Sequence, residues 1–360
     1  MNFKSKRFVI IGAGNGGQSL AGDLILKGVN VQAIYNRGSE KIKPIQEKGG
    51  IQLSGPIVNG FAPISLVTSN LEKAIKAGNI FLVAITANAQ KDFAKKVAPY
   101  VNKSQTFLLI PGYIGSSIAF ARALKDAGVQ EMPLIGEALS LPYATRLIAP
   151  AHAGIKSRKL IFPIAAYPAS RNKELYNNIR PAISETILFS NTFEIGFNNP
   201  NPISHTVYYL FNLGKVESTE GKIGDFHSWG TPIVDRIKND LDNERISITR
   251  CMGIKAYSYN QLGEMAYKDI HYTPIKQELD KLPPTSYQIP DRFIDEDIPM
   301  GLIPLQSFGK LLKIPTPTTD LIIQMANMVR QKDFAKEGTN ITNLGLKKMS
   351  PEQMINYINF

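Results

Sequence analysis

One histidine stands in a setting where proton-transfer chemistry is feasible. The chain has four histidines, and His205 follows the segment Asn-Asn-Pro-Asn-Pro at 198–202. A residue before proline is driven out of the helical region, whereas proline is well tolerated as the first residue of a helix. The sequence therefore predicts a helix with Asn201 as its N-cap, Pro202 as its first residue, His205 in its first turn and Gly214 at its end.

This position affects the acid–base behaviour of the ring. A first-turn histidine lies near the positive end of the helix dipole, which favours neutral imidazole over imidazolium. To donate a proton near neutral pH, His205 would need a carboxylate beside it. Three consecutive acids, at 295–297, follow Arg292 and precede an Ile-Pro pair. They are candidate partners, although a histidine that merely packs and a solvated acidic run explain the same residues.

The composition excludes several classes of function. With 360 residues, of which 43% are hydrophobic and 20% charged, two domains are expected. No apolar run reaches the roughly 18 residues of a membrane span. The single cysteine, Cys251, leaves no internal disulfide and fits the cytoplasm, and no metal-ligand cluster is apparent. The net charge is +11, but the basic residues are dispersed, so we expect a surface that attracts anionic small molecules rather than nucleic acid.

The N-terminal residues carry a nucleotide-binding pattern. An apolar run at 8–11 leads into Gly-Ala-Gly-Asn-Gly-Gly, a stretch with helical spacing follows, and a second strand is expected over 29–35. In such a strand–loop–helix–strand unit, the glycines allow a tight turn and let a pyrophosphate approach the helix N-terminus. The sequence thus predicts dinucleotide binding by Gly12, Gly14, Asn15, Gly16 and Gly17, with Thr86 at the carboxyl end of a later strand.

The residues after the second strand bear on the choice of cofactor. NAD enzymes usually carry an acid there that binds the ribose hydroxyls. Asn36, Arg37 and Ser39 occupy this position, and the first acid is Glu40. Arg37 can pair with a 2′-phosphate and Ser39 can donate to it. We therefore expect NADP(H), with NAD(H) as the alternative if Glu40 takes the ribose.

Strands and helices alternate through the first half of the chain. Strands are predicted over 80–85, 106–110 and 132–137, helices over 39–47, 71–76, 90–101, 116–127 and 171–180, and β-rich stretches over 51–67 and 143–168. Helical periodicity dominates later, over 232–252, 258–267, 303–312, 319–331 and a short stretch from 350, and a loop at 271–290 is long enough for a lid. We expect an α/β fold, with a doubly wound Rossmann sheet in residues 1–187 and an all-helical domain in residues 188–360.

Four segments in this order point to a known family. They are the glycine loop, Glu-Ala-Leu-Ser-Leu-Pro-Tyr-Ala-x-Arg at 137–146, Asn-Pro-x-x-His ending at His205, and Glu-Asp-Ile-Pro-x-Gly-Leu-x-Pro at 296–304. Over nearly its whole length the chain resembles the opine dehydrogenases, the octopine/nopaline dehydrogenase family. The resemblance implies an active site between a Rossmann domain and a helical domain. It also implies NAD(P)H-dependent condensation of an α-keto acid with the amino group of an amino acid.

The resemblance also assigns roles to individual residues. It implies that His205 is the catalytic histidine, that Asp297 is its partner, and that Arg292 engages a substrate carboxylate. Glu137 and Tyr143 are expected to shape the substrate pocket. An aspartate behind a histidine fixes its tautomer and charge, so the implied pair is chemically coherent.

Other interpretations stay open from the sequence. Thr206 and Met300 stand where the family often has a proline and an aromatic residue, which bears on substrate identity more than on reaction type. A ketopantoate-reductase-like or hydroxyacid dehydrogenase would instead use a lysine near the start of the second domain, where Lys215 is the candidate. A non-catalytic NADP-binding redox sensor would keep the glycine loop and Arg37 but would not need His205 to meet Asp297. The sequence leaves the oligomeric state open, with a homodimer as one expectation.

Overall fold

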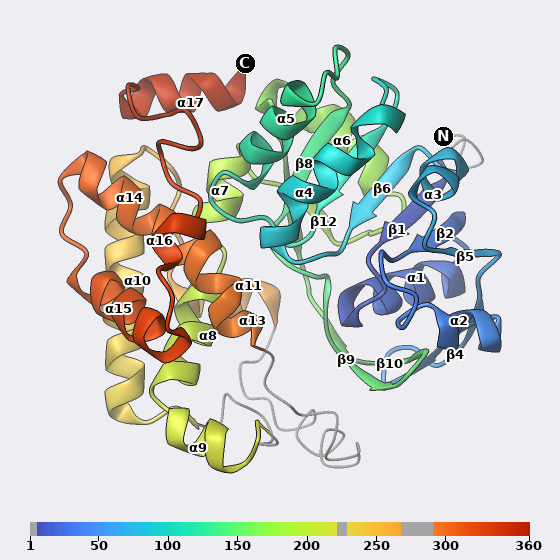
Figure 1. Ribbon diagram of the computed structural model, residues 1–360, viewed down its shortest axis with the longest axis horizontal. Coiled ribbons are helices and arrows are strands. Elements are labelled where there is room, and N and C mark those ends of the chain that lie inside the picture. The colour runs from blue at the N-terminus through green and yellow to red at the C-terminus, as the bar shows by residue number, and fades with distance from the viewer. Residues whose placement is uncertain (1–5, 222–228, 268–290) are drawn as a thin grey trace.

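An eight-stranded sheet forms the centre of the N-terminal half of the molecule (Figure 1). The computed structural model describes residues 6–221, 229–267 and 291–360, so the loop predicted at 271–290 lies outside the described residues. Neighbouring strands are parallel except β11, which runs antiparallel to β8. In spatial order the strands are β12 (Thr186–Leu188), β11 (Phe162–Tyr167), β8 (Leu134–Ala138), β7 (Thr106–Leu109), β6 (Ile80–Val83), β1 (Phe8–Ile11), β2 (Val31–Tyr35) and β5 (Leu66–Thr68).

The central strands are buried on both faces, which is why they read as continuous apolar runs. In β1, Phe8 and Ile10 pack into one core with Leu20 of α1, whereas Val9 and Ile11 pack into a second core with Phe120 of α5. The helices that accompany the sheet are α1 (Asn15–Leu26), α2 (Lys43–Lys48), α3 (Leu71–Ala77), α4 (Ala87–Val97), α5 (Ser116–Asp126) and α6 (Asn172–Ile179). The doubly wound Rossmann architecture predicted from the sequence is therefore confirmed.

A smaller four-stranded sheet lies against α1 and the glycine loop. Its strand order is β4 (Gly60–Pro63), β3 (Gly50–Ser54), β10 (His152–Arg158) and β9 (Tyr143–Ala149). The stretches predicted to be β-rich thus divide between the two sheets, because β5 and β11 join the large sheet while β3, β4, β9 and β10 form the small one. Asn15 links the two parts, since its Nδ2 donates to the carbonyl oxygen of Thr145 at 2.9 Å.

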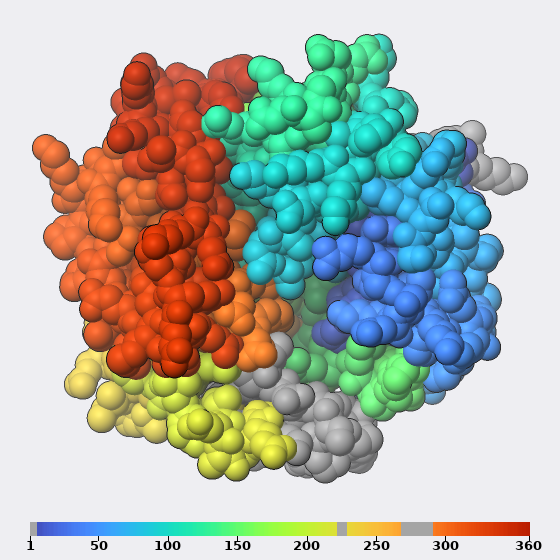
Figure 2. All heavy atoms as spheres, in the orientation of Figure 1, coloured from blue at the N-terminus to red at the C-terminus, as the bar shows by residue number. Residues whose placement is uncertain are grey.

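From residue 192 onward the described residues form helices and no strands. Figure 1 shows them gathered beside the Rossmann half, and Figure 2 shows the two halves in contact along a long seam. The helices are α7 (Thr192–Phe197), α8 (Asn201–Leu210), α9 (Leu213–Ser218), α10 (Pro232–Cys251), α11 (Tyr259–Ala266), α13 (Arg292–Asp295), a π-helical turn (Ile298–Leu302), α14 (Ile303–Leu312), α15 (Pro317–Arg330), α16 (Phe334–Glu337) and α17 (Pro351–Asn359).

The last helix returns to the Rossmann half. Tyr357 of α17 packs against Tyr167 of β11 with ring centroids 6.1 Å apart, and Asn191 Nδ2 donates to Asn359 Oδ1 at 3.4 Å. The boundary at 187/188, which remains a sequence prediction, falls inside β12. Spatially, the C-terminal helix thus bridges both halves.

The helix that carries His205 differs from the sequence prediction at both ends. Its first residue is Asn201, with Pro200 at the N-cap position, and Asn199 Oδ1 accepts the Asn201 N–H at 3.0 Å. His205 is therefore the fifth residue of α8, just past the first turn. The helix ends at Leu210, and Gly214 lies inside α9, so the prediction that Gly214 terminates α8 was wrong.

Candidate active site

His205 and Asp297 meet in the interior of the molecule. His205 Nδ1 lies 2.9 Å from Asp297 Oδ2, although the two residues are 92 positions apart in the chain. The side chain of Asp297 has no exposed surface, and His205 is 8% exposed. The imidazole also stacks on Phe293, with ring centroids 3.7 Å apart and planes 5° from parallel. These contacts fix the orientation of the ring, which is what directional proton transfer requires.

Tyr113 forms a hydrogen bond with the second carboxylate oxygen of Asp297. Its phenol donates to Asp297 Oδ1 at 2.6 Å, and Tyr113 is itself only 1% exposed. Burial raises the pKa of Asp297 to about 7, while the charge of Arg292 and the hydrogen bond from Tyr113 oppose that rise. The carboxyl group therefore titrates near neutral pH, well above the ordinary range of an aspartate.

Arg292 and Glu296 lie on the same segment as Asp297. Arg292 Nη1 contacts Glu296 Oε2 at 3.5 Å, and the arginine lies over the face of Phe293 at 5.4 Å. The arginine side chain is 39% exposed, whereas that of Glu296 is 2% exposed. The long, single contact is weaker than a bidentate ion pair. A carboxylate arriving from outside could therefore compete for Arg292 without dismantling a strong pair.

Glu296 ties this segment to the Rossmann half. Its Oε1 accepts the backbone N–H of Ala87, the first residue of α4, at 2.8 Å. Burial raises the pKa of Glu296 to about 7, and the neighbouring charge of Arg292 opposes the shift. Glu296 thus connects the segment that contains Asp297 to the carboxyl edge of the large sheet. Ligands bind at this edge in folds of this type.

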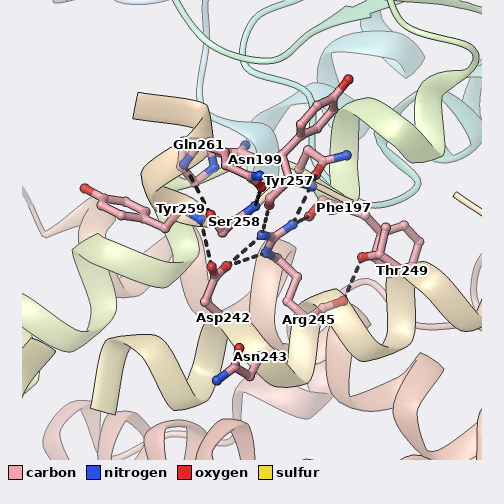
Figure 3. Close-up of polar contacts among 12 residues, drawn as sticks. Phe197, Asn199, Asp242, Asn243, Arg245, Thr249, Tyr257, Ser258, Tyr259 and Gln261 are labelled. Atoms are coloured by element: carbon pink, nitrogen blue, oxygen red, sulfur yellow. Dashed lines mark hydrogen bonds and ion pairs between the residues drawn. The ribbon is translucent and has the colours of Figure 1, made fainter. Parts of the chain in front are cut away.

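A buried polar cluster fixes the turn that leads into α8 (Figure 3). Arg245 of α10 pairs with Asp242 at 2.7 Å and donates to the carbonyl oxygen of Phe197 at 2.7 Å. Arg245 also donates to Asn198 Oδ1 at 3.3 Å, and Asn199 Nδ2 donates to the Gly112 carbonyl at 2.8 Å. The turn before His205 is therefore held from two sides, by α10 and by the loop that carries Tyr113.

Glu137 lies behind that loop rather than in an open pocket. It has no exposed surface, its Oε1 accepts the N–H of Ser117 at 2.6 Å, and a Cβ added at Gly112 would lie 2.4 Å from its Oε2. Burial raises the pKa of Glu137 to about 8. These contacts support the Gly112–Tyr113 turn, and a role of Glu137 in the substrate pocket stays a prediction from the sequence.

Tyr143 is also a buried side chain. It is 3% exposed, belongs to the hydrophobic core of the Rossmann half, and has Arg158 over its ring at 5.5 Å. Arg158 in turn makes a bidentate pair with the buried Asp23 of α1 at 2.6 and 3.1 Å. Tyr143 is the first residue of β9 in the small sheet, and its role in the substrate pocket stays a prediction from the sequence.

The glycine loop fits a dinucleotide. Gly12 has a φ of 104°, and a Cβ there would lie 2.4 Å from the carbonyl oxygen of Ala84. A Cβ at Gly17 would lie 1.7 Å from the Gly12 carbonyl oxygen, whereas Gly14 has nothing within 4 Å. The N-cap of α1, Gly14, brings no side chain to the first N–H groups of the helix. Gly14 and the N-terminus of α1 thus form a cradle of the kind that binds phosphate groups.

The other predicted cofactor residues line the same edge of the sheet. Asn36 Oδ1 accepts the N–H of Ala13 at 3.1 Å, so Asn36 braces the glycine loop. Arg37 and Ser39 are exposed just after β2, and Thr86 is exposed at the end of β6. Asn15 directs one amide hydrogen to Thr145, while its buried Oδ1 has no partner among the described residues. Gly16 contacts the side chain of Leu141, so the loop also borders the segment after β8.

Tyr113 and Glu296 are the functional candidates that the sequence interpretation missed. Tyr113 lies in a loop with no motif of its own, and only the fold brings it to Asp297. Glu296 belongs to the acidic run, but nothing in the sequence distinguishes its bond to Ala87 from a solvated charge. Within the described ranges, no group of three or more His, Cys, Asp or Glu residues is arranged to hold a metal ion. None of the described helices is long and apolar enough to cross a membrane.

Comparisons with known proteins show which families the two halves of the chain resemble. Residues 188–330 match the family model described as NAD/NADP octopine/nopaline dehydrogenase, alpha-helical domain, and residues 7–110 match the model described as NADP oxidoreductase, coenzyme F420-dependent. The opine dehydrogenase of Arthrobacter sp. (strain 1C) is 27% identical over 356 residues, which cover 96% of this chain and 97% of that protein.

Solved structures show the same fold. Octopine dehydrogenase with NADH and L-arginine superimposes with a TM-score of 0.71 at 15% identity, covering 97% of this chain and 98% of the other. Yersinopine dehydrogenase with NADP⁺ gives a TM-score of 0.72 at 15% identity, covering 99% and 98%. At these identities the structural likeness shows the fold alone.

Proposed function

The chain belongs to the opine dehydrogenase family of NAD(P)-dependent oxidoreductases, and we propose that His205 and Asp297 are the proton-transfer centre of its reaction. The family reaction is the reductive condensation of an α-keto acid with the amino group of an amino acid. The observation that carries the proposal is the 2.9 Å contact between His205 Nδ1 and the fully buried Asp297 carboxyl group. A nucleotide-binding protein without catalysis would have no use for this arrangement.

His205 serves as the general acid and base of the reaction. When an amine adds to the keto acid and water leaves, the departing oxygen must take up a proton. Asp297 holds Nδ1, so Nε2, on the other side of the ring, is the nitrogen that exchanges protons with substrate. The buried carboxylate stabilises the imidazolium form, and the Tyr113 hydrogen bond keeps the carboxylate in place.

Arg292 serves as the anchor for a substrate carboxylate. Its guanidinium can bind a carboxylate through two parallel N–H donors, which positions as well as binds it. It lies over Phe293, on which the His205 ring stacks, so a carboxylate on Arg292 lies close to the imidazole. The long contact to Glu296 is exchanged for the substrate.

The cofactor is held by the glycine loop and by the residues after β2. NAD(P)H supplies the hydride when bound. Gly12, Gly14, Asn15, Gly16 and Gly17 would hold the phosphates of the cofactor, and Asn36 braces the loop. Arg37 and Ser39, both exposed and with no carboxylate in the place where NAD enzymes carry one, favour the 2′-phosphate of NADPH over NADH.

The partners of this enzyme are small molecules, an α-keto acid and an amino acid. A homodimer and a cytoplasmic location stay predictions from the sequence. The ketopantoate-reductase-like alternative is less favoured, because its candidate lysine, Lys215, is exposed on α9 and contacts the face of Trp229 at 5.1 Å. The contact between His205 and Asp297 favours a catalytic protein over a redox sensor. A redox sensor would have no reason to bring these two residues together.

The test is a panel of amino acids with pyruvate and other α-keto acids, followed by the absorbance of NADPH, with NADH in parallel. We expect cofactor oxidation that requires both the keto acid and an amino acid. Oxidation by a keto acid alone would instead identify a hydroxyacid dehydrogenase or ketopantoate-type reductase. Tight NADPH binding without turnover on any pair would favour the sensor.

A further inference from the structure

Lys159 is a half-buried cation whose partner is a hydroxyl group rather than an acid. Its Nζ lies 2.5 Å from Ser140 Oγ, and no carboxylate of the described residues pairs with it. Other buried cations are balanced, since Arg245 pairs with Asp242, Lys238 with Asp235 and Arg158 with Asp23. An ammonium group withdrawn from water without an anion is unfavourable, so this position calls for an explanation.

The position of this ammonium group is informative. Ser140 follows β8 at the carboxyl edge of the large sheet, and a Cβ added at Gly16 of the glycine loop would lie 3.0 Å from Cδ1 of the next residue, Leu141. Lys159 directly follows β10, and its backbone N–H donates to the Pro142 carbonyl at 2.9 Å. The following residue, Leu160, donates to the Ala266 carbonyl at the end of α11 at 2.9 Å. The backbone of this segment thus joins the Rossmann half to the helical half, and the ammonium group lies beside Ser140, just after β8.

The chemistry of the reaction requires a second anion site. Condensation of an α-keto acid with an amino acid brings two carboxylates to the same centre, and the product keeps both. Arg292 can hold one of them in bidentate geometry, and the other carboxylate needs a second cation, for which Lys159 is the candidate among the described residues. A carboxylate would supply the missing negative charge, and Ser140 would add a neutral donor beside it.

We propose that Lys159 and Ser140 form an anion subsite that binds a carboxylate of one of the two substrates. The inference rests on the proposed function, because it takes its ligand from that reaction. Its chemical class is an α-keto carboxylate or an α-amino carboxylate, and the experiment below separates the two. Burial lowers the pKa of Lys159 to about 8, so the group still carries its charge at neutral pH.

The test compares Lys159→Met and Ser140→Ala with the wild type, with Lys96→Met on the exposed face of α4 as the matched control. Loss of a charge-assisted hydrogen bond predicts a rise of roughly 10- to 100-fold in KM for one substrate in Lys159→Met. The rise for Ser140→Ala is expected to be smaller. KM for the other substrate, the Kd of NADPH measured by fluorescence, and all constants of Lys96→Met should stay within twofold of the wild type.

A pair of ligands identifies which carboxylate is bound. The best amino acid of the panel is compared with the amine that lacks its carboxylate, both as substrates with pyruvate. If Lys159 binds the amino acid, its substitution weakens the amino acid but leaves the decarboxylated amine unchanged. If it binds the keto acid, KM for pyruvate rises with either amine. Both results support the subsite and distinguish its ligand.

Two results would overturn the subsite while leaving the proposed function intact. One is a wild-type enzyme with amine-dependent turnover whose KM values are unchanged in Lys159→Met. The other is a loss of NADPH binding in that variant, which would assign the lysine to a cofactor phosphate. A purely structural lysine would lower the melting temperature without moving either KM, and that result also contradicts the proposal. Absence of amine-dependent turnover in the wild type would instead refute the proposed function.

Discussion

Tyr113 donates a hydrogen bond to the oxygen of Asp297 that His205 does not touch, so one buried carboxyl group is held by residues from both halves of the molecule. Tyr113 belongs to the loop after β7, and His205 to α8. The position of one half relative to the other therefore affects the hydrogen bonds of Asp297. A change in either half that moves the loop of Tyr113 would alter the protonation of Asp297.

Removal of the tyrosine hydroxyl tests that relationship. The bond from Tyr113 lowers the pKa of Asp297 against the effect of burial, so Tyr113→Phe should raise that pKa further. Because the ionised carboxylate is the form that supports the imidazolium, the acid limb of the kcat profile should move to higher pH, and kcat at pH 7 should fall by about 10-fold. The control is Tyr176→Phe on α6. An unchanged acid limb in Tyr113→Phe would show that the phenol is only a packing group.

Arg37 tests the cofactor assignment. Arg37→Asp removes the cation proposed for the 2′-phosphate and introduces an acid that can bind ribose hydroxyls. The ratio of kcat/KM for NADPH to that for NADH should fall at least 10-fold, which corresponds to about 1.4 kcal/mol. Lys41→Asp, a nearby exposed residue, controls for the change in net charge. Equal ratios in Arg37→Asp and the wild type would mean that the 2′-phosphate site lies elsewhere.

Glu137 predicts a dependence of stability on pH. Its folded pKa of about 8 lies above the ordinary 4.5, so the folded protein retains this proton where the unfolded chain has lost it. The corresponding stability is fully present below about pH 4.5 and is lost as the pH rises through 8. Glu137→Gln removes this titration, so its melting temperature should fall less between pH 5 and 9 than that of the wild type. The control is Glu47→Gln on the surface. If the melting temperatures of the wild type and Glu137→Gln fell equally between pH 5 and 9, the result would contradict a buried, protonated Glu137.

Arg245 tests the buried cluster that holds the turn before His205. Arg245→Met leaves the Asp242 carboxylate buried without its cation and frees the Phe197 carbonyl, which should reduce the free energy of unfolding by about 3–5 kcal/mol. The exposed pair Lys103–Glu131 offers a comparison. Lys103→Met should change the free energy of unfolding by at most about 1 kcal/mol. Urea unfolding measures both. A loss below about 1 kcal/mol for Arg245→Met would mean that the cluster contributes little to the fold.

The sequence predicts the architecture well where local patterns decide it. The apolar runs at 8–11, 80–83 and 106–109 are buried strands, and Thr231–Pro232 opens the long helix α10, because these signals depend on neighbouring residues alone. The end of α8 was placed wrongly, since the helix stops at Leu210 while Gly214 continues into α9. Its start lies one residue upstream of the predicted one, with Pro200 instead of Asn201 at the N-cap position.

The site could be predicted only in part, for a physical reason. His205 and Asp297 lie in distinctive motifs, and a titratable ring near an acidic run suggests a pair even before a fold is known. Tyr113 and Lys159 carry no local signal, because their roles arise from contacts across 184 and 19 positions of the chain. Glu137 and Tyr143 are both buried, which a conspicuous motif does not reveal, and their place at the substrate stays a prediction.

Substitution of the histidine tests the central claim most directly. For His205→Ala, amine-dependent NADPH oxidation is measured at saturating keto acid and amino acid, together with the Kd of NADPH by fluorescence titration. The loss of a general acid predicts a kcat lower by about 10²–10⁴-fold with an unchanged Kd. Full activity in His205→Ala would contradict the assignment of proton transfer to the His205–Asp297 pair.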